Sequence, residues 1–244
     1  MIYNKFLILL FYYERPKTFT NALHSILNIN YSNFKVHVID DGSINKAEPI
    51  IRNYCSSIID KFIFTYITDT VEDKIQRGGS IFGNYANLAI ENSEADHIIP
   101  LCDDDAIYPN FLEKLNDLLN QNPYEKQYYH HLALYDPLKE FYLDKINNTW
   151  TSRNYHTGEI LLPYNVDSCQ VTFSRKAFIE DNIKYPFPQT ANLDAKIFEQ
   201  MGNKWGPCKF SGLFSQVKGD NIDSLGIRQH LENIYKPADM DMNL

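Results

Sequence analysis

Cysteine is scarce in this sequence, and the cysteines that occur are far apart. None of them forms a Cys-x-x-Cys pair or has a partnering histidine at a metal-binding spacing. This pattern argues against a structural zinc site and against a disulfide framework. We therefore expect free thiols and a reducing, cytoplasmic compartment. The four cysteines are Cys55, Cys102, Cys169 and Cys208.

Long hydrophobic runs and an excess of positive charge are also missing. The hydrophobic run nearest a terminus, Phe6–Tyr13, is too short to span a bilayer, and Glu-Arg-Pro follows it instead of a small-residue cleavage site. We therefore expect no transmembrane segment. The formal net charge is −8 at pH 7. This charge argues against holding a phosphate backbone by counterion release, so we expect no nucleic-acid partner.

What the chain does have is an ordinary globular composition. Apolar residues make up 44% of the sequence and charged residues 22%, so disorder, collagen and a coiled coil are excluded as descriptions of the whole chain. A chain of 244 residues can bury roughly 70% of its unfolded surface in a closed core. We find no internal repeat or low-complexity linker, which favours one domain over residues 1–244.

Continuous apolar runs alternate with amphipathic helical patterns in residues 1–122. The run Phe6–Phe11 is apolar throughout, which is typical of a strand covered on both faces of a parallel sheet. Apolar residues then recur at helical spacing over Phe19–Leu27. This alternation predicts an α/β fold with a mostly parallel sheet flanked by helices. Further strands are expected at 36–39, 62–67 and 97–101, and further helices at about 46–59, around 82–89 and after Pro109.

The rest of the chain is patterned differently. Short aromatic-rich runs at 127–135 and 138–144 and a run at 166–173 predict a mixed or antiparallel second half, and apolar spacing predicts a helix over about 192–201. Residues 68–80, by contrast, are polar, contain two adjacent glycines and lack periodicity. We expect them to form a long, mobile loop.

Two of the expected parallel strands end in acidic residues. Asp40 and Asp41 close the second strand, and Asp103, Asp104 and Asp105 follow the fourth. Ligands of an open parallel sheet bind outside the carboxyl ends of its strands, and five carboxylates gathered there repel one another unless a cation neutralises them. Hard oxygen ligands select Mg²⁺, Mn²⁺ or Ca²⁺. The alternatives are an Asx turn for the first pair and a solvated turn for the triplet.

Four segments of the first half occur in the order and spacing of a known family. Residues 11–16 (FYYERP) look like that family's Thr-Tyr-Asn-Arg-Pro segment, and residues 38–43 (VIDDGS) look like its second strand and acidic turn. Residues 87–90 (NLAI) and 98–105 (IIPLCDDD) look like the helix and strand that lead to its D-x-D motif. Over about residues 5–120, the chain therefore resembles the inverting nucleotide-sugar glycosyltransferases of family 2, which have the Rossmann-like GT-A fold.

The resemblance implies a role for each acidic residue. Asp41 would accept a hydrogen bond from the donor's base, and Asp103 or Asp104 would bind its ribose. Asp105 would bind the divalent cation, Mn²⁺ or Mg²⁺, that bridges the two phosphates and takes up the charge that develops on the leaving diphosphate. Glu14 departs from the family's usual asparagine. The donor contacts of its loop therefore stay open, with a solvated turn charge as the alternative.

The resemblance returns in pieces between residues 166 and 224 and places the general base there. Asn192–Ala195 is similar to the family segment that carries the catalytic aspartate at a helix start. Asp194 would therefore take the proton of the acceptor hydroxyl, with helix capping as the alternative role. Asp167 is a second candidate for the base. Lys218 stands where the family often has a histidine, and it would meet a phosphate oxygen as a point charge.

Other candidates come from residue type alone. Arg77, in the glycine-bearing segment, is a candidate for contacting the diphosphate or the base, with a solvated loop charge as the alternative. Sugars stack on aromatic faces, so aromatic residues of the second half are candidates for an acceptor platform, with core packing as the alternative. They are Trp150, Tyr155, His156 and Trp205.

Together these features predict a metal-dependent, hexosyltransferase-like enzyme. It would move a sugar from a nucleotide-diphosphate donor, with UDP favoured, to a glycan, lipid-linked or protein-linked sugar acceptor, with inversion. Residues 1–122 would bind the nucleotide sugar, and residues 123–244 would bind the acceptor and carry the catalytic base. Two alternatives stay open: a sugar nucleotidyltransferase, although the first loop lacks a glycine-rich phosphate cradle, and a non-catalytic carbohydrate-binding module of the same fold.

Overall fold

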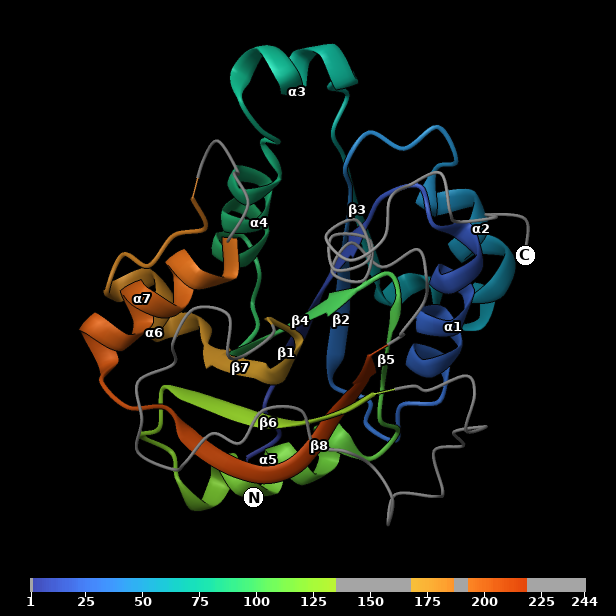
Figure 1. Cartoon of the computed structure of the whole chain (residues 1–244). Coiled ribbons are helices and arrows are strands. Elements are labelled where there is room, and N and C mark those ends of the chain that lie inside the picture. Colours follow the sequence, from blue (N-terminus) through green and yellow to red (C-terminus); the bar gives the residue numbers. More distant parts are fainter. Residues whose placement is uncertain (1, 135–167, 187–192, 219–244) are drawn as a thin grey trace.

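The computed structural model describes residues 2–134, 168–186 and 193–218, and these residues form one eight-stranded sheet with helices on both faces (Figure 1). The strand order in this described part is β3-β2-β1-β4-β7-β6-β8-β5. One part of the sheet is parallel and the other is mixed. The expected α/β fold with a mixed second half is therefore confirmed.

The first four strands along the chain form the parallel part of the sheet. They are β1 (Phe6–Tyr12), β2 (Phe34–Asp40), β3 (Phe62–Tyr66) and β4 (His97–Cys102). β1 lies between β2 and β4, and its register places Tyr12 beside Asp40 and Phe11 beside Cys102. Because these strands run in one direction, the turns that follow them meet at one edge of the sheet. The acidic segments begin at this edge.

The remaining strands continue the sheet beyond β4. They are β5 (Asp105–Ile107), β6 (Gln127–Leu134), β7 (Val171–Ser174) and β8 (Lys209–Lys218). β7 is antiparallel to β4 and β6, whereas β8 is parallel to β6 and antiparallel to β5. The strand expected at 166–173 begins only at Val171, after a 3₁₀ turn over Ser168–Gln170. The sequence did not indicate β5, which is short, or β8, which lacks a strict apolar alternation.

A proline shapes the junction between the two parts of the sheet. The ladder between β4 and β7 pairs only His97 and Ile98 of β4. Pro100 has no N–H and cannot donate to a neighbouring strand. Its carbonyl instead accepts a hydrogen bond from Nε2 of the buried Gln216 on β8, at 2.8 Å. β8 is thereby held against the end of β4, next to the acidic turn.

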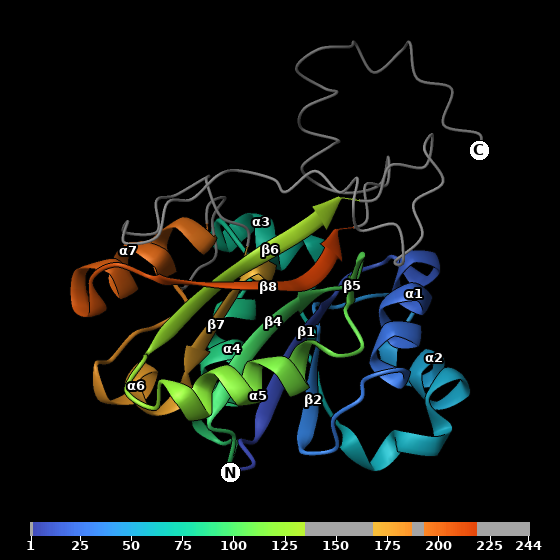
Figure 2. The same cartoon turned by 90° about the horizontal axis from the view of Figure 1, so that it is seen from below.

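Alternate residues of β1 pack into two apolar cores, one on each face of the sheet. Figure 2 shows helices on both faces of the sheet. Ile8 and Leu10 pack with α1, α2 and α5, whereas Leu7 and Leu9 pack with α4, α6 and α7. The helices are α1 (Pro16–Leu27), α2 (Ala47–Tyr54), α4 (Phe82–Glu91), α5 (Phe111–Gln121), α6 (Arg175–Glu180) and α7 (Leu193–Trp205). Burial on both faces explains why the sequence of β1 is apolar without alternation.

A short helix, α3 (Val71–Arg77), occupies the segment that we expected to be a loop. Thr70 and Asp73 form a reciprocal capping box at its start, and Gly78 ends it in the left-handed conformation at φ 78°. No residue of α3 is buried, so its sequence carries no apolar stripe. The expectation of a structureless loop over 68–80 was therefore wrong, because local capping forms this helix without core packing.

Several smaller expectations can also be compared with the structure. No disulfide bond joins any of the four cysteines, all of which lie in the described ranges. The helix expected over 46–59 ends at Tyr54, and a separate 3₁₀ helix, Ser56–Lys61, follows it. The aromatic run at 138–144 lies outside the described residues. Within the described ranges, no helix combines the length and the apolar character needed to cross a membrane.

Candidate active site

The two aspartates that follow β2 have different surroundings. Asp40 is 1% exposed, and its carboxylate accepts hydrogen bonds from the backbone N–H groups of Ser43 (2.9 Å) and Ala47 (3.0 Å). It therefore forms the Asx-type turn and holds the start of α2. Asp41 directs its carboxylate elsewhere, to Ser80 and Lys74. Of the two acids, Asp41 is thus the one whose carboxylate is not bound to the backbone of its own turn.

Two side-chain groups converge on Asp41, and an aromatic ring packs against one of them. The hydroxyl of Ser80 donates to Oδ1 at 2.8 Å, and Nζ of Lys74 lies 3.1 Å from Oδ2. The same ammonium donates to the backbone carbonyl of Asp41 at 2.6 Å and lies 4.5 Å from the centre of the Tyr13 ring. Sequence reasoning missed Lys74, because α3 carries no periodic signal. The Thr-x-x-Asp capping pattern was the one local clue to this helix.

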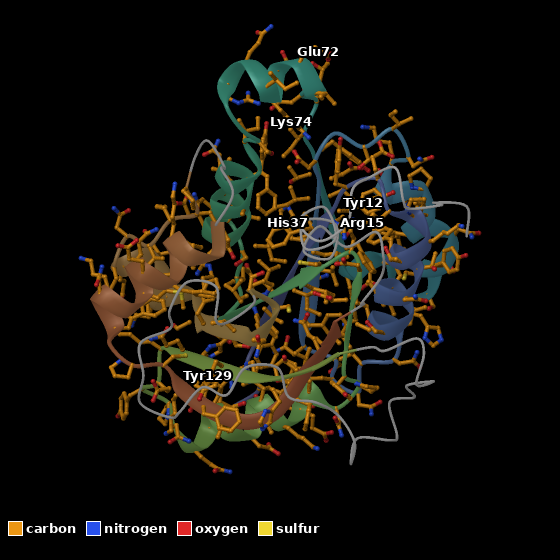
Figure 3. All side chains as sticks on the ribbon, viewed as in Figure 1. Tyr12, Arg15, His37, Glu72, Lys74 and Tyr129 are labelled. Carbon is orange, nitrogen blue, oxygen red and sulfur yellow. The ribbon has the colours of Figure 1, made fainter. Side chains whose placement is uncertain are left out.

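The acidic triplet after β4 is paired with an arginine from the first loop. Nη1 of Arg15 lies 2.6 Å from Oδ2 of Asp104 and 3.2 Å from Oδ1 of Asp103. The backbone N–H of Tyr13 also donates to Asp103, at 2.9 Å. Figure 3 shows Arg15 beside Tyr12, at the carboxyl end of β1. The triplet is therefore not a solvated turn, since a partly buried cation and a backbone donor hold it.

Burial sets the protonation of the first acid in this triplet. It raises the pKa of Asp103 to about 7, and the neighbouring Asp104 adds to the effect. Arg15 and the N–H of Tyr13 act in the opposite direction, because both favour the charged carboxylate. Asp103 is thus a buried acid whose charge responds to the cations placed around it.

A group of potential metal ligands lies at the same turn. One atom each from Cys102, Asp104 and Asp105 can be chosen so that all three lie within 4.8 Å of one another. Asp105 is 1% exposed and begins β5, where it pairs with Lys218 of β8. Two carboxylates suit Mg²⁺ or Mn²⁺, whereas a thiol suits softer metals. The carboxylates of Asp104 and Asp105 therefore fit a hard divalent cation, and Cys102 is not needed as a ligand.

Glu14 connects the loops that follow β1 and β2. Its backbone is left-handed, with φ of 52°. Its carboxylate accepts hydrogen bonds from the N–H of Ile44 and from Nδ2 of Asn45, the latter at 3.2 Å. The alternative of a freely solvated turn charge is therefore wrong, since Glu14 joins the first loop to the turn that contains Asp41.

The other expected site residues are placed less directly. Arg77 is on α3, and its guanidinium pairs with Asp69 and donates to the carbonyl of Gly79. The backbone of Lys218 lies opposite Asp105 in the β5–β8 ladder, but its side chain lies outside the described part of the structure. Asp194 is in the first turn of α7, as expected, and its side chain also lies outside that part.

Most of the expected aromatic platform cannot be placed. Trp150, Tyr155 and His156 lie outside the described residues, as does Asp167, the second candidate for the base. Trp205 packs against the core formed with α4, α6 and α7, and its Nε1 donates to Oδ2 of Asp181 at 2.6 Å. The packing alternative therefore describes Trp205.

Comparisons with known proteins agree with this geometry. Residues 7–180 match the model of glycosyl transferase family 2. An uncharacterized glycosyltransferase of Rickettsia typhi is 29% identical over 109 residues, which are 45% of this chain and 30% of that protein.

Solved structures with the same fold include two complexes with nucleotide sugars. S. aureus TarS 1–349 in complex with UDP-GlcNAc has a TM-score of 0.65 at 15% identity, with 89% of this chain and 59% of that chain covered. The mannosyltransferase PcManGT from Pyrobaculum calidifontis, in complex with GDP-Man and Mn²⁺, has a TM-score of 0.63 at 12% identity, with 92% and 59% covered. This chain thus spans less than two thirds of each of these proteins.

The family model covers more than half of the chain, and its match spans the strands whose ends carry the acidic residues. The mixed eight-stranded sheet with flanking helices matches the solved GT-A structures at a TM-score of 0.63. The chain therefore belongs to glycosyl transferase family 2 and has the GT-A fold.

Proposed function

We propose that this chain is a metal-dependent glycosyltransferase. It transfers a sugar from a nucleotide-diphosphate donor, with UDP favoured, to a hydroxyl of a glycan, lipid-linked or protein-linked acceptor. One observation carries the proposal: Asp41 follows β2, and Asp104 and Asp105 follow β4, so two acidic turns lie at the carboxyl edge of the parallel strands, and the second brings two carboxylates together. The family match supports a transferase, and a Mn²⁺ complex of a structural relative supports the cation.

Each acid has one task in this proposal. Asp41 accepts an N–H of the donor's base, and Asp103 accepts a ribose hydroxyl. Asp104 and Asp105 hold Mn²⁺ or Mg²⁺, which neutralises the charge that develops on the leaving diphosphate. Arg15 now pairs with Asp104. This guanidinium holds the carboxylate in the absence of the cation, which would take its place.

The acceptor is deprotonated from the second half of the chain. Asp194 follows the first residue of α7, where the helix dipole stabilises a negative charge. Its carboxylate takes the proton of the acceptor hydroxyl as the new glycosidic bond forms and the bond to the diphosphate breaks. Attack from the face opposite the leaving group inverts the anomeric carbon. The backbone of Lys218 is opposite Asp105, which supports a phosphate contact by this lysine.

The test is calorimetric titration with UDP in Mn²⁺ and in EDTA. We expect UDP to bind only in the presence of the cation. We expect Asp105→Asn to lose the metal-dependent part of the affinity for UDP. Asp117→Asn, an exposed acid on α5, is the matched control and should bind as the wild type does. Undiminished binding of UDP in EDTA would contradict the role of the cation.

Arg15 favours one alternative, a non-catalytic module of the same fold. Its ion pairs with Asp103 and Asp104 already neutralise part of the acidic turn without a metal. Hydrolysis of a UDP-sugar by the protein in Mn²⁺ separates the two functions. A catalytic chain releases UDP slowly even without an acceptor, whereas a binding module releases none.

A further inference from the structure

The contact between Lys74 and Asp41 has no role in the function proposed above. We propose that Lys74 is a positioning residue, which holds the carboxylate of Asp41 in the orientation that accepts an N–H of the donor's base. The inference rests on the proposed function, because it assigns the base to Asp41. It adds a residue from a helix that the sequence did not predict.

One ammonium group binds two different atoms of Asp41. Nζ of Lys74 is 2.6 Å from the backbone carbonyl and 3.1 Å from Oδ2. These two contacts lie on either side of the Asp41 side-chain torsions, so rotation of the carboxylate breaks the second contact while the first stays. The ammonium of Lys74, which the backbone carbonyl holds in place, therefore fixes the orientation of the Asp41 carboxylate.

The second carboxylate oxygen of Asp41 is fixed independently. Oδ1 accepts the hydroxyl of Ser80 at 2.8 Å, and this hydroxyl in turn accepts the N–H of Phe82 at the start of α4. A carboxylate has about four lone-pair sites, so one contact on each oxygen leaves capacity for a ligand. Because an ionised carboxylate only accepts, the ligand group that fits there is an N–H or O–H donor.

The surroundings make the ion pair stronger than an ordinary surface contact. The side chain of Lys74 is 17% exposed and that of Asp41 is 21% exposed. The ammonium also lies over the Tyr13 ring, which adds a cation–π contact and restricts the lysine further. Reduced solvent screening and restricted rotamers both favour a fixed geometry over an exchanging one.

The backbone around Asp41 is built for this close approach. Gly42 has φ of 80°, and a Cβ at this position would lie 2.8 Å from the carbonyl oxygen of Asp69 and 3.8 Å from Nζ of Lys74. Glycine therefore allows the segment before α3 to pack directly on the turn after β2. Figure 3 shows Lys74 on the side of α3 that faces the sheet and Glu72 on the outer side. Since no residue of α3 is buried, this polar contact is its main described link to the site.

The experiment compares three probes in Mn²⁺ by calorimetry: UDP, N3-methyl-UDP and inorganic pyrophosphate. N3-methyl-UDP lacks the ring N–H that Asp41 would accept, and pyrophosphate lacks the base altogether. For Lys74→Met we expect about a tenfold loss of affinity for UDP, or about 1.4 kcal/mol. We expect less than a twofold change for N3-methyl-UDP and pyrophosphate. Lys74→Arg should recover most of the loss, because a guanidinium can make both contacts.

Lys46→Met is the matched control, since it removes the same charge from an exposed position at the start of α2. Unchanged pyrophosphate affinity in Lys74→Met shows that this variant is folded. An equal loss for UDP and pyrophosphate would overturn the proposal, because Lys74 would then act on the phosphates. Full UDP affinity in Lys74→Met would overturn it as well. If the wild type binds pyrophosphate but not UDP, the proposed function fails in its assignment of the donor's base to Asp41. That failure is seen in the wild type and is therefore distinct from a failure of the role of Lys74.

Discussion

Replacing Arg15 by methionine tests how the acidic turn is stabilised. The side chains of Asp103 and Asp104 are 5% and 7% exposed, and Arg15 is 26% exposed. Removing one partner of a buried charge pair costs about 3–5 kcal/mol. The exposed part of Arg15 is screened by solvent, which reduces the expected loss to about 2–3 kcal/mol. In a chain of this size, 1 kcal/mol corresponds to about 2–4 °C, so Tm should fall by about 4–12 °C.

The assay is thermal unfolding in EDTA and in a series of Mn²⁺ concentrations. Arg15→Met should unfold at the lower temperature in EDTA and should gain more from Mn²⁺ than the wild type, since the cation no longer competes with the guanidinium for Asp104. Lys17→Met removes the same charge from an exposed position of α1 and serves as the control. Equal Tm values for the two variants in EDTA would refute the reasoning.

Three further predictions concern other parts of the molecule. Asp194→Asn should lower kcat by roughly 10² to 10⁴ with little change in UDP affinity, and a near-normal transfer rate would point to Asp167 as the base. Gly42→Ala should lower the free energy of unfolding in urea by about 1–3 kcal/mol, because its φ and the nearby carbonyl of Asp69 exclude a Cβ; an unchanged midpoint would contradict this. Burial lowers the pKa of His130 to about 3, so the unfolded chain takes up this proton near pH 6.5 while the native chain does not. Stability should therefore fall by about 2 kcal/mol between pH 7 and pH 5, and this part of the pH dependence should be absent from the urea unfolding of His130→Asn.

The parallel part of the fold could be predicted from the sequence because burial there determines the pattern of apolar residues. Strands covered on both faces are apolar without interruption, and the helices between them carry one apolar stripe. The acidic edge followed from the same reasoning, since parallel strands end together. What the residues alone left open, before the family resemblance, was which of Asp40 and Asp41 points away from the backbone of its own turn. Asp40 binds the backbone of its own turn, whereas Asp41 faces Lys74.

The parts that could not be predicted depend on contacts between distant residues. Lys74 is on a helix without an apolar face, so hydrophobic periodicity does not predict the helix that positions this lysine. Arg15 pairs with acids far along the chain, and nothing in its own segment shows which ones. β5 is too short for a pattern and exists because β8 pairs with it. Such features follow from tertiary packing, which local propensity does not encode.

The pairing of β5 with β8 also has a consequence for the order of assembly. Asp105 lies only three residues after the end of β4, but its ladder partner is more than a hundred positions later in the chain. Contacts of such sequence separation form late, since the entropy of closing a long loop must be overcome first. During synthesis the acidic turn emerges well before the strand that braces it. The acidic turn would then bind a cation only after β8 has paired with β5. In a refolding experiment, the appearance of cation binding would therefore report the native sheet and not a collapsed intermediate.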